Sequence, residues 1–202
     1  MTRTEKVLLF LLGIAFLPML LWGDSFFLNF IQKSGEGSII IKTAEFFSHY
    51  GRLEWSTLLP ALVLFLFSLV SSNKKQWKRL SLCCLLGGIL AGISVWPPKT
   101  LLGRERPYGD GNGAFHFLKF NSRTESVYHS MPSGHAASTM GSAWALVRIH
   151  PATGLPFFIA SIATGWSRVK TDKHWPSDVL MGWLLGIVST IPIVRWLQRK
   201  KR

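Results

Sequence analysis

Two histidines and an aspartate in the second half of the chain carry groups that can attack or protonate a substrate: His135, His174 and Asp178. Three cations occur in the same region of the sequence, namely Lys99, Arg106 and Arg168. Fixed positive charge neutralises phosphate oxygens and so allows a nucleophile to reach phosphorus. Together these residue types predict phosphoryl transfer.

The first stretch with this chemistry is KTLLGRERP, residues 99–107. Its Lys99 and Arg106 are seven residues apart, about two turns of a helix, so both side chains can point at one pocket. Arginine offers a fork that matches phosphate oxygens, and lysine offers a point charge. Pro107 then ends the segment. The alternative is a pair of cations at the end of a membrane span, where long basic side chains commonly reach the interface.

The second stretch is Pro132-Ser133-Gly134-His135, just before an apolar run. Ser133 is a good helix N-cap, and Gly134 allows backbone N–H groups to approach a ligand closely. A helix start also binds anions through its free N–H groups and its dipole. His135 is placed to protonate a leaving oxygen. The alternative is an ordinary capped helix with an interfacial histidine.

The third stretch is SRVKTDKHWPSD, residues 167–178, with Arg168, His174 and Asp178. His174 and Asp178 are i and i+4, so a helix would place them on one face. A carboxylate bonded to one ring nitrogen fixes the tautomer and leaves the other nitrogen free to attack. Pro176 suits a first helical turn, which leaves open whether His174 lies inside that helix. A metal site made of His135, His174 and Asp178 is the alternative, but the nearby cations would repel a divalent ion.

Hydrophobic runs separate these stretches and must position them. The chain has 202 residues, 48% of them hydrophobic, and this length suits one domain, 1–202, with its motif core at 99–178. A helix needs about 20 apolar residues to cross a bilayer, and about 17 is the lower end. Some runs are short by that measure, and a buried soluble helix is the alternative for those. We expect an all-α, polytopic bundle of six transmembrane helices at Val7–Trp22, Ser56–Val70, Leu80–Trp96, His135–Ile149, Ala152–Ser167 and Val179–Leu197.

Two polar regions lie between the runs. Residues 24–55 mix aromatic and charged residues and predict one or two short amphipathic helices on the outer membrane surface; an ordinary packed loop is the alternative. Residues 108–131 form the longest polar loop. Because long loops are usually functional, we expect this one to belong to the substrate entrance.

The basic residues predict the orientation of the chain. With both termini cytoplasmic, 12 of the 23 basic residues and one acid lie inside, whereas 11 basic residues and nine acids lie outside. Lys and Arg are retained on the cytoplasmic side, so the net charge of +13 is mainly a topology signal. Nucleic-acid binding is the competing interpretation of so basic a chain. All three stretches fall on the outer face, as expected for an outward-facing anion site.

The three stretches, in this order, resemble the signature of the type 2 phosphatidic acid phosphatase family. That signature has Lys, six residues and Arg-Pro, then Pro-Ser-Gly-His, then Ser-Arg, five residues, His, three residues and Asp, and every position is matched here. The resemblance implies that His174 becomes a phosphohistidine oriented by Asp178, while His135 protonates the leaving oxygen and then activates water. It implies no metal and no cofactor. The phosphate would be held by Lys99, Arg106, Ser133, Gly134 and Arg168.

The resemblance also implies a lipid phosphate phosphatase of a bacterial inner membrane, with its site facing the periplasm. Undecaprenyl diphosphate, phosphatidylglycerol phosphate, phosphatidic acid and lipid A 1-phosphate all fit as substrates. The alternatives are a lipid-to-lipid phosphotransferase and a non-catalytic lipid-binding or transport protein. We expect membrane lipids as the surroundings, no nucleic acid and no obligate protein partner. Arg104 and Arg123 are further candidates for phosphate or head-group contacts, whereas His116 and His129 are expected to pack the loop.

Overall fold

The structure is a computed structural model, and it describes residues 2–35, 37–109, 112–118 and 126–199. Within these ranges the chain is helical, apart from loops and one isolated bridge between Arg104 and Phe115. The all-α prediction is confirmed for the described residues. The helices are α1 (Arg3–Pro18), α2 (Asp24–Lys33), α3 (Ser38–Tyr50), α4 (Leu59–Val70), α5 (Lys74–Ser94), α6 (Trp96–Leu102), α7 (Gly134–Ile149), α8 (Pro151–Lys170) and α9 (Pro176–Arg199), with π-helical turns at Met19–Gly23 and Glu54–Leu58 and a 3-10 turn at Ser126–Tyr128.

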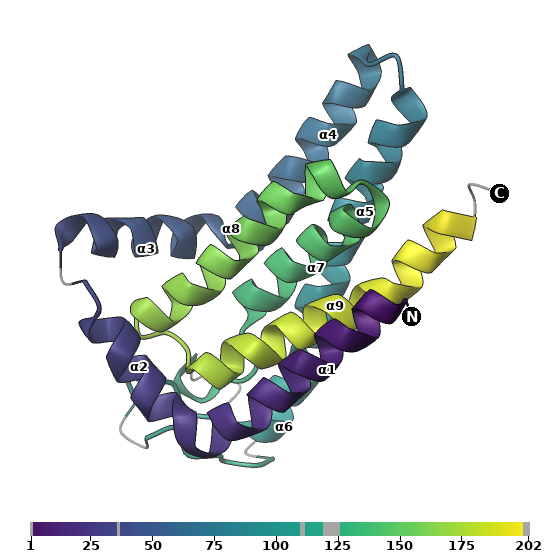
Figure 1. Cartoon of the computed structure of the whole chain (residues 1–202). Helices are drawn as coiled ribbons and strands as arrows, with labels where there is room; N and C mark the ends of the chain where they lie inside the picture. The colour runs from purple at the N-terminus through teal and green to yellow at the C-terminus, as the bar shows by residue number, and fades with distance from the viewer. Residues whose placement is uncertain (1, 36, 110–111, 119–125, 200–202) are drawn as a thin grey trace.

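Helix α7 lies at the centre of the bundle and packs against α5, α8 and α9 (Figure 1). Every residue from Ala136 to Leu146 is buried. Small residues let the neighbouring backbones approach closely, as they do in membrane bundles: a Cβ placed on Gly141 would lie 2.4 Å from the carbonyl oxygen of Gly87 in α5. The helix that begins with the Pro-Ser-Gly-His stretch is therefore held on three sides.

Three helical stretches are long and apolar enough to cross a membrane, which supports an integral-membrane protein: Glu5–Lys33, Lys74–Leu102 and Pro176–Arg199. The pair Ser38–Tyr50 and Glu54–Val70, bent by 73°, adds a fourth if it counts as one span. Helices α7 and α8 cover the fourth and fifth predicted spans but do not meet this criterion. At 16 residues, α7 is about 24 Å long, shorter than the bilayer core of about 30 Å. The number six stays a prediction.

The N-terminal region differs from the predicted boundaries. The first apolar helix continues beyond Trp22 through the π-helical turn into α2, and the ribbon changes direction there (Figure 1). Helices α2 and α3 occupy the region predicted to hold short amphipathic helices. Their location on a membrane surface stays a prediction.

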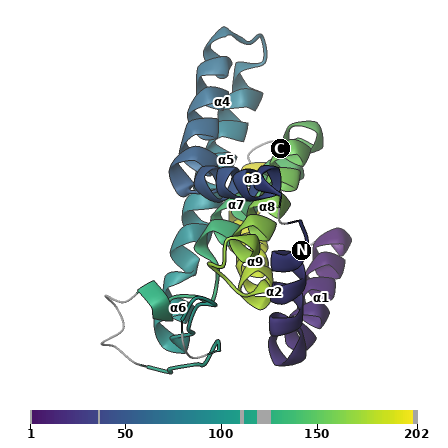
Figure 2. The same ribbon diagram turned by 90° about the vertical axis from the view of Figure 1, so that its left-hand side faces the viewer.

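The first turns of α1 lie beside α9, and α9 ends on the side of the molecule away from α6 (Figures 1 and 2). Nε of Arg148, near the end of α7, lies 3.1 Å from a carboxylate oxygen of Glu5 in α1. Nη2 of Arg79 in α5 donates to the carbonyl oxygen of Leu197 in α9 at 2.6 Å. These contacts agree with termini on a common side, while the side of the membrane stays a prediction.

Candidate active site

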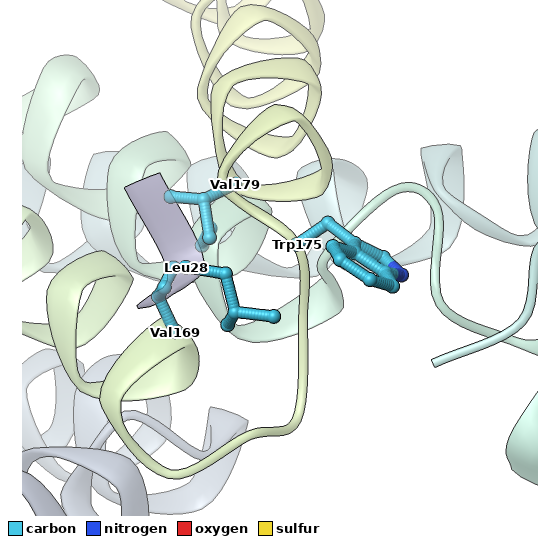
Figure 3. Close-up of a cluster of buried hydrophobic side chains, with 5 residues drawn as sticks. Leu28, Val169, Trp175 and Val179 are labelled. Atoms are coloured by element: carbon cyan, nitrogen blue, oxygen red, sulfur yellow. The ribbon is translucent and has the colours of Figure 1, made fainter. Parts of the chain in front are cut away.

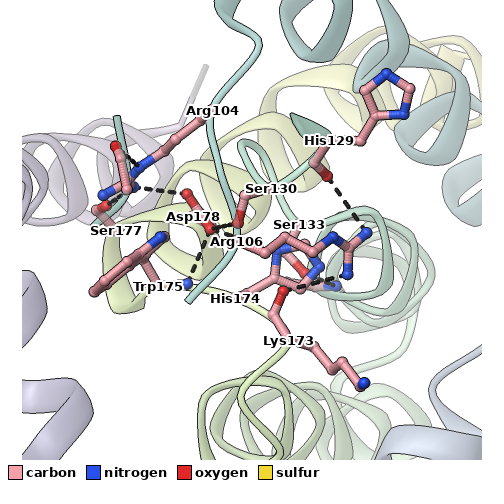
Figure 4. A network of polar contacts seen from close by, with 12 residues as sticks. Arg104, Arg106, His129, Ser130, Ser133, Lys173, His174, Trp175, Ser177 and Asp178 are labelled. Atoms are coloured by element: carbon pink, nitrogen blue, oxygen red, sulfur yellow. Dashed lines mark hydrogen bonds and ion pairs between the residues drawn. The ribbon is translucent and has the colours of Figure 1, made fainter. Parts of the chain in front are cut away.

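The three sequence stretches meet at the end of the bundle that carries α6 and the α8–α9 loop (Figure 1). Figure 4 shows one residue from each stretch close together: Arg106, Ser133 and His174. Hydrogen bonds join them. The N–H of Ser133 donates to the carbonyl of Asp178 at 2.9 Å, which links the second and third stretches. Nη1 of Arg106 donates to the carbonyl of Lys173 at 3.3 Å, which links the first and third. All eight predicted site residues lie in this region. They are Lys99, Arg106, Ser133, Gly134, His135, Arg168, His174 and Asp178.

Lys99 and Arg106 point at the same acceptor, although not from one helix. Helix α6 ends at Leu102, and Gly103 caps it in the left-handed conformation with φ of 54°, which glycine adopts most readily. Nζ of Lys99 donates to the carbonyl oxygen of His129 at 2.6 Å, and Nη2 of Arg106 donates to the same oxygen at 3.5 Å. The predicted convergence is present, but the two-turn helical spacing behind it is wrong.

The Pro-Ser-Gly-His stretch forms the start of α7. Ser133 is the N-cap residue, and its hydroxyl oxygen accepts from the N–H of Ala136 at 3.5 Å. The predicted cap is therefore confirmed. His135 stands in the first turn of α7 and lines the space between the cations.

His174 lies in the α8–α9 loop, two residues before α9 begins at Pro176. The sequence left open whether His174 lies inside this helix, and it does not, because Pro176 starts the helix after the histidine. The loop nevertheless brings the pair together, with Nδ1 of His174 3.5 Å from Oδ2 of Asp178. That ring nitrogen is buried and has no hydrogen-bond partner.

The imidazole of His174 is held neutral. It is fully enclosed, and this burial lowers its pKa well below the usual value; the positive charges of Lys99, Arg106 and Arg168, together with His135, lower the pKa further. Both effects disfavour the protonated ring. A neutral imidazole keeps a nitrogen lone pair available for attack on phosphorus.

Apolar packing fixes the loop that carries His174. Leu28 of α2, Val169 of α8, Trp175 and Val179 form a buried cluster beside it (Figure 3). The indole N–H of Trp175 also donates to the carbonyl oxygen of Glu105 at 2.8 Å. The histidine loop is therefore clamped between helices α2 and α8 and the loop after α6.

Asp178 is held by residues that the sequence did not assign to it. Its Oδ1 accepts from Nη1 of Arg104 at 2.7 Å, while its Oδ2 accepts from the hydroxyl of Ser130 and from the N–H of Trp175 at 2.9 Å. Nη2 of Arg104 lies 2.6 Å from Oδ2 of Asp24 in α2. The side chain of Arg104 is 4% exposed and its guanidinium points into this network (Figure 4), so the prediction of a phosphate contact for Arg104 is wrong.

A sequence signal for this network existed. Asp24 follows directly after an apolar run and has no basic neighbour within eight residues. An acid at the end of a membrane helix calls for a partner. The first stretch contains an arginine, Arg104, that the signature does not use. This arginine is the partner of Asp24.

The other titratable candidates lie outside the catalytic geometry. The imidazole of His116 pairs with Glu105 at 2.8 Å, so it packs the loop as predicted. His129 contributes its carbonyl oxygen to the two cations. Arg123, the remaining candidate, lies outside the described residues.

Arg168 supplies a free donor to the site. One of its terminal nitrogens donates to the hydroxyl of Ser48 in α3, whereas its Nε is buried without a hydrogen-bond partner. Burial of an unpaired guanidinium donor is costly. An anion that accepts from this nitrogen would remove the cost.

Two cavities open beside the site, and both reach His135. One has a volume of about 910 Å³ and is lined mostly by charged and polar residues, among them Ser48, Arg52, Arg106, Arg168 and Lys173. The other has a volume of about 430 Å³ and combines Arg52 and Lys99 with an apolar wall. That wall includes Ile89, Ile93 and Trp96. The arrangement can hold a phosphate next to an apolar chain.

Known proteins are similar to this chain in sequence and in fold. Residues 76–202 match the family model of the PAP2 superfamily. The chain is 26% identical over 143 residues to an undecaprenyl-diphosphatase of Sulfolobus acidocaldarius, covering 70% of this chain and 63% of that protein. It is 31% identical over 103 residues to a lipid A 1-phosphatase of Rhizobium johnstonii, covering 50% of this chain and 40% of that protein. The match thus spans less than two thirds of each of these relatives.

A third relative matches over more of its length. A decaprenylphosphoryl-5-phosphoribose phosphatase of Mycobacterium tuberculosis is 30% identical over 152 residues, covering 73% of this chain and 75% of that protein. Among solved structures, LpxE of Aquifex aeolicus superposes with a TM-score of 0.63 at 22% identity, covering 85% of this chain and 94% of that one. That likeness shows a shared fold. With the family model matched over more than half of its length, this chain belongs to the PAP2 superfamily.

Proposed function

We propose that this protein is an integral-membrane lipid phosphatase that hydrolyses a phosphate monoester or diphosphate on a lipid. The observation that carries the proposal is the convergence of Lys99, Arg106 and Arg168 on the space beside His135 and His174. The apolar wall beside Lys99 matches a lipid chain. The polar cavity on the other side matches a charged head group.

The reaction proceeds in two steps. The Nε2 lone pair of His174 forms a bond to phosphorus while the bond from phosphorus to the leaving oxygen breaks. His135, which is protonated at the start of this step, gives its proton to that oxygen. His135 then takes a proton from water, whose oxygen attacks phosphorus as the N–P bond breaks. Free phosphate leaves and His174 is neutral again. Asp178 faces Nδ1 and compensates the positive charge that the ring carries between the two steps.

The phosphate oxygens are bound by cationic and backbone donors that already face the site. Nε of Arg168 is unpartnered, and Lys99 and Arg106 can exchange their carbonyl partners for phosphate oxygens, which accept more strongly. Ser133 and Gly134 contribute the N-terminus of α7, where free N–H groups and the helix dipole favour an anion. No metal enters this scheme, because the positive charge comes from the protein.

The substrate is proposed from this chemistry and from the relatives. Their names describe phosphatases of undecaprenyl diphosphate, of lipid A at its 1-phosphate and of decaprenylphosphoryl-5-phosphoribose. A phosphate or diphosphate on a long-chain lipid is common to these names, and phosphatidic acid and phosphatidylglycerol phosphate share that chemistry. We place the site at the periplasmic face of a bacterial inner membrane, in a single domain.

Phosphate release by the purified protein tests the proposal. The detergent-solubilised protein is incubated with a panel of lipid phosphates and diphosphates, with and without EDTA. We expect free phosphate from at least one lipid, loss of activity in His174→Ala and no effect of EDTA. His150→Ala is the control, because His150 caps α8 and lies outside the site. If phosphate appears on an acceptor lipid instead of in solution, the protein is a phosphotransferase and not a hydrolase. Full activity in His174→Ala would refute the mechanism.

A further inference from the structure

A buried ion network links the nucleophile to a residue outside the family's matched region. The guanidinium of Arg104 bridges two carboxylates, with Nη1 2.7 Å from Oδ1 of Asp178 and Nη2 2.6 Å from Oδ2 of Asp24. Their side chains are 4%, 0% and 8% exposed, respectively. Asp24 lies in α2, whereas the family model begins at residue 76.

Ser177 ties this bridge to the start of α9. Its N–H donates to Oδ1 of Asp24 at 2.8 Å and its hydroxyl donates to Oδ2 at 2.6 Å, while that hydroxyl also accepts from Nη1 of Arg104 at 2.6 Å. Both oxygens of Asp24 are therefore engaged, and the residue next to Asp178 in the sequence is fixed. Asp24 contacts neither cavity beside the site.

The charges within the network determine what Asp178 can offer to His174. One guanidinium and two carboxylates leave one net negative charge in a buried region, where charge interactions are stronger than in water. Without the charge of Asp24, Arg104 would neutralise Asp178. The carboxylate would then compensate less of the positive charge that forms on the imidazole when it bonds to phosphorus.

We propose that Asp24 is a positioning residue of the active site, which holds Arg104 so that Asp178 keeps its orientation and its negative charge toward His174. Asp24 touches no reacting atom in this scheme and acts through Arg104. The inference rests on the proposed phosphohistidine mechanism. It assigns to the N-terminal region an effect on the rate of phosphoryl transfer that is transmitted through Arg104.

The test is Asp24→Asn, which removes the charge and keeps the shape. We expect kcat to fall between about 10-fold and 100-fold, the range for residues that orient a catalytic group, while KM changes by less than about 2-fold because Asp24 lines no cavity. The single-turnover rate of His174 phosphorylation should fall by the same factor as kcat. Asp24→Glu restores the charge and should recover part of the rate.

Asp172→Asn is the matched control. Asp172 also joins the α8–α9 loop to α2, through a 2.7 Å hydrogen bond from Gln32, but it does not contact Arg104. Its φ of 59° is a conformation that asparagine tolerates well. The control should retain the wild-type kcat. It thereby distinguishes a loss of rate caused by weaker packing of α2 from one caused by a change at Asp178.

Three outcomes would overturn the inference: a kcat of Asp24→Asn within about 2-fold of wild type, an equal loss in Asp172→Asn, or an effect on KM alone. If Asp24→Asn does not fold, Ser177→Ala takes its place, since it removes the bridging hydroxyl and no charge. It should lower kcat several-fold with KM unchanged, and a wild-type kcat would count against the proposal. A wild type that forms no phosphohistidine would instead overturn the proposed function.

Discussion

Nδ1 of His174 lies 3.5 Å from Oδ2 of Asp178, at the outer limit of a hydrogen bond. The same carboxylate oxygen already accepts from Ser130 and from the N–H of Trp175. These two neighbours therefore fix the position of the Asp178 carboxylate independently of His174. Hydrogen bonds in free active sites often shorten only when substrate binds, and we expect this one to shorten when the ring becomes positive.

Asp178→Asn should lower kcat by about 10²-fold to 10⁴-fold. The amide cannot stabilise a positively charged imidazole, and its NH₂ group favours the wrong tautomer of His174. Single-turnover phosphoryl transfer measures the effect directly. Ser130→Ala, which removes one hydrogen bond to the carboxylate and no charge, should cost less. Equal losses in the two variants would show that the charge of Asp178 is unimportant.

The dependence of kcat/KM on pH reports the free enzyme. Burial and nearby cations hold the pKa of His174 well below its usual value of about 6.5. The fall in kcat/KM that protonation of this ring causes, the acid limb, should therefore lie at a pH below about 6.5. Arg106→Gln removes one of those cations, so the pKa of His174 should rise and the acid limb should move to higher pH.

The pH profiles are measured between about pH 5 and 8 with one substrate, so that ionisation of the substrate is common to both enzymes. Lys173→Gln is the control, because Lys173 is next to His174 in the sequence but is not among the charges that shift its pKa. An acid limb that stays in place in Arg106→Gln, or moves to lower pH, would contradict the proposed electrostatics.

Arg168→Lys should reduce kcat/KM by between about 10-fold and 100-fold, since a hydrogen bond to a charged group is worth about 1.5–3 kcal/mol. Lysine keeps the charge but has no counterpart to the unpartnered Nε. Ser48→Ala removes only the outer partner of the guanidinium and should have a smaller effect. Wild-type kinetics in Arg168→Lys would show that charge alone suffices at this position.

Gly141→Ala should lower the stability of the protein by about 1–3 kcal/mol, the usual cost of overpacking. The added Cβ would meet the carbonyl oxygen of Gly87 at 2.4 Å, whereas at Gly92 in the same interface the nearest atom is 3.9 Å away. Gly92→Ala should therefore leave the Tm unchanged or raise it, because alanine favours helix by up to about 1 kcal/mol. Equal Tm values for the two variants in detergent would contradict the close packing of α5 and α7.

The convergence of the site was predictable because its residues lie next to apolar runs, at positions that a consistent topology places at one end of a bundle. The path of the chain was not: Gly103 ends α6 after Leu102, and nothing in the spacing of Lys99 and Arg106 reveals that turn. The sequence also could not show that α7 is a short helix in the interior of the bundle. Its small residues are buried against other helices, and hydropathy alone does not distinguish that burial from contact with lipid.

The role of Arg104 could not be assigned from local sequence. Its partner Asp24 is 80 residues away, and the two meet because α2 packs beside α9 and Arg104 binds Asp178 of α9. A spacing rule reports which residues can share a helix face, whereas this pairing depends on tertiary contacts. Asp24 was visible as an acid after an apolar run, and Arg104 as an arginine that the signature does not use. The fold supplied the connection between them.

Trapping of the covalent intermediate tests the mechanism most directly. Wild-type protein is mixed with a lipid carrying a labelled terminal phosphate, quenched in alkali and digested, and the labelled peptide is sequenced. The mechanism predicts acid-labile, alkali-stable label on His174, formed at least as fast as kcat and absent from His174→Ala. Label on another residue, or full turnover with no labelled enzyme at any time, would contradict it.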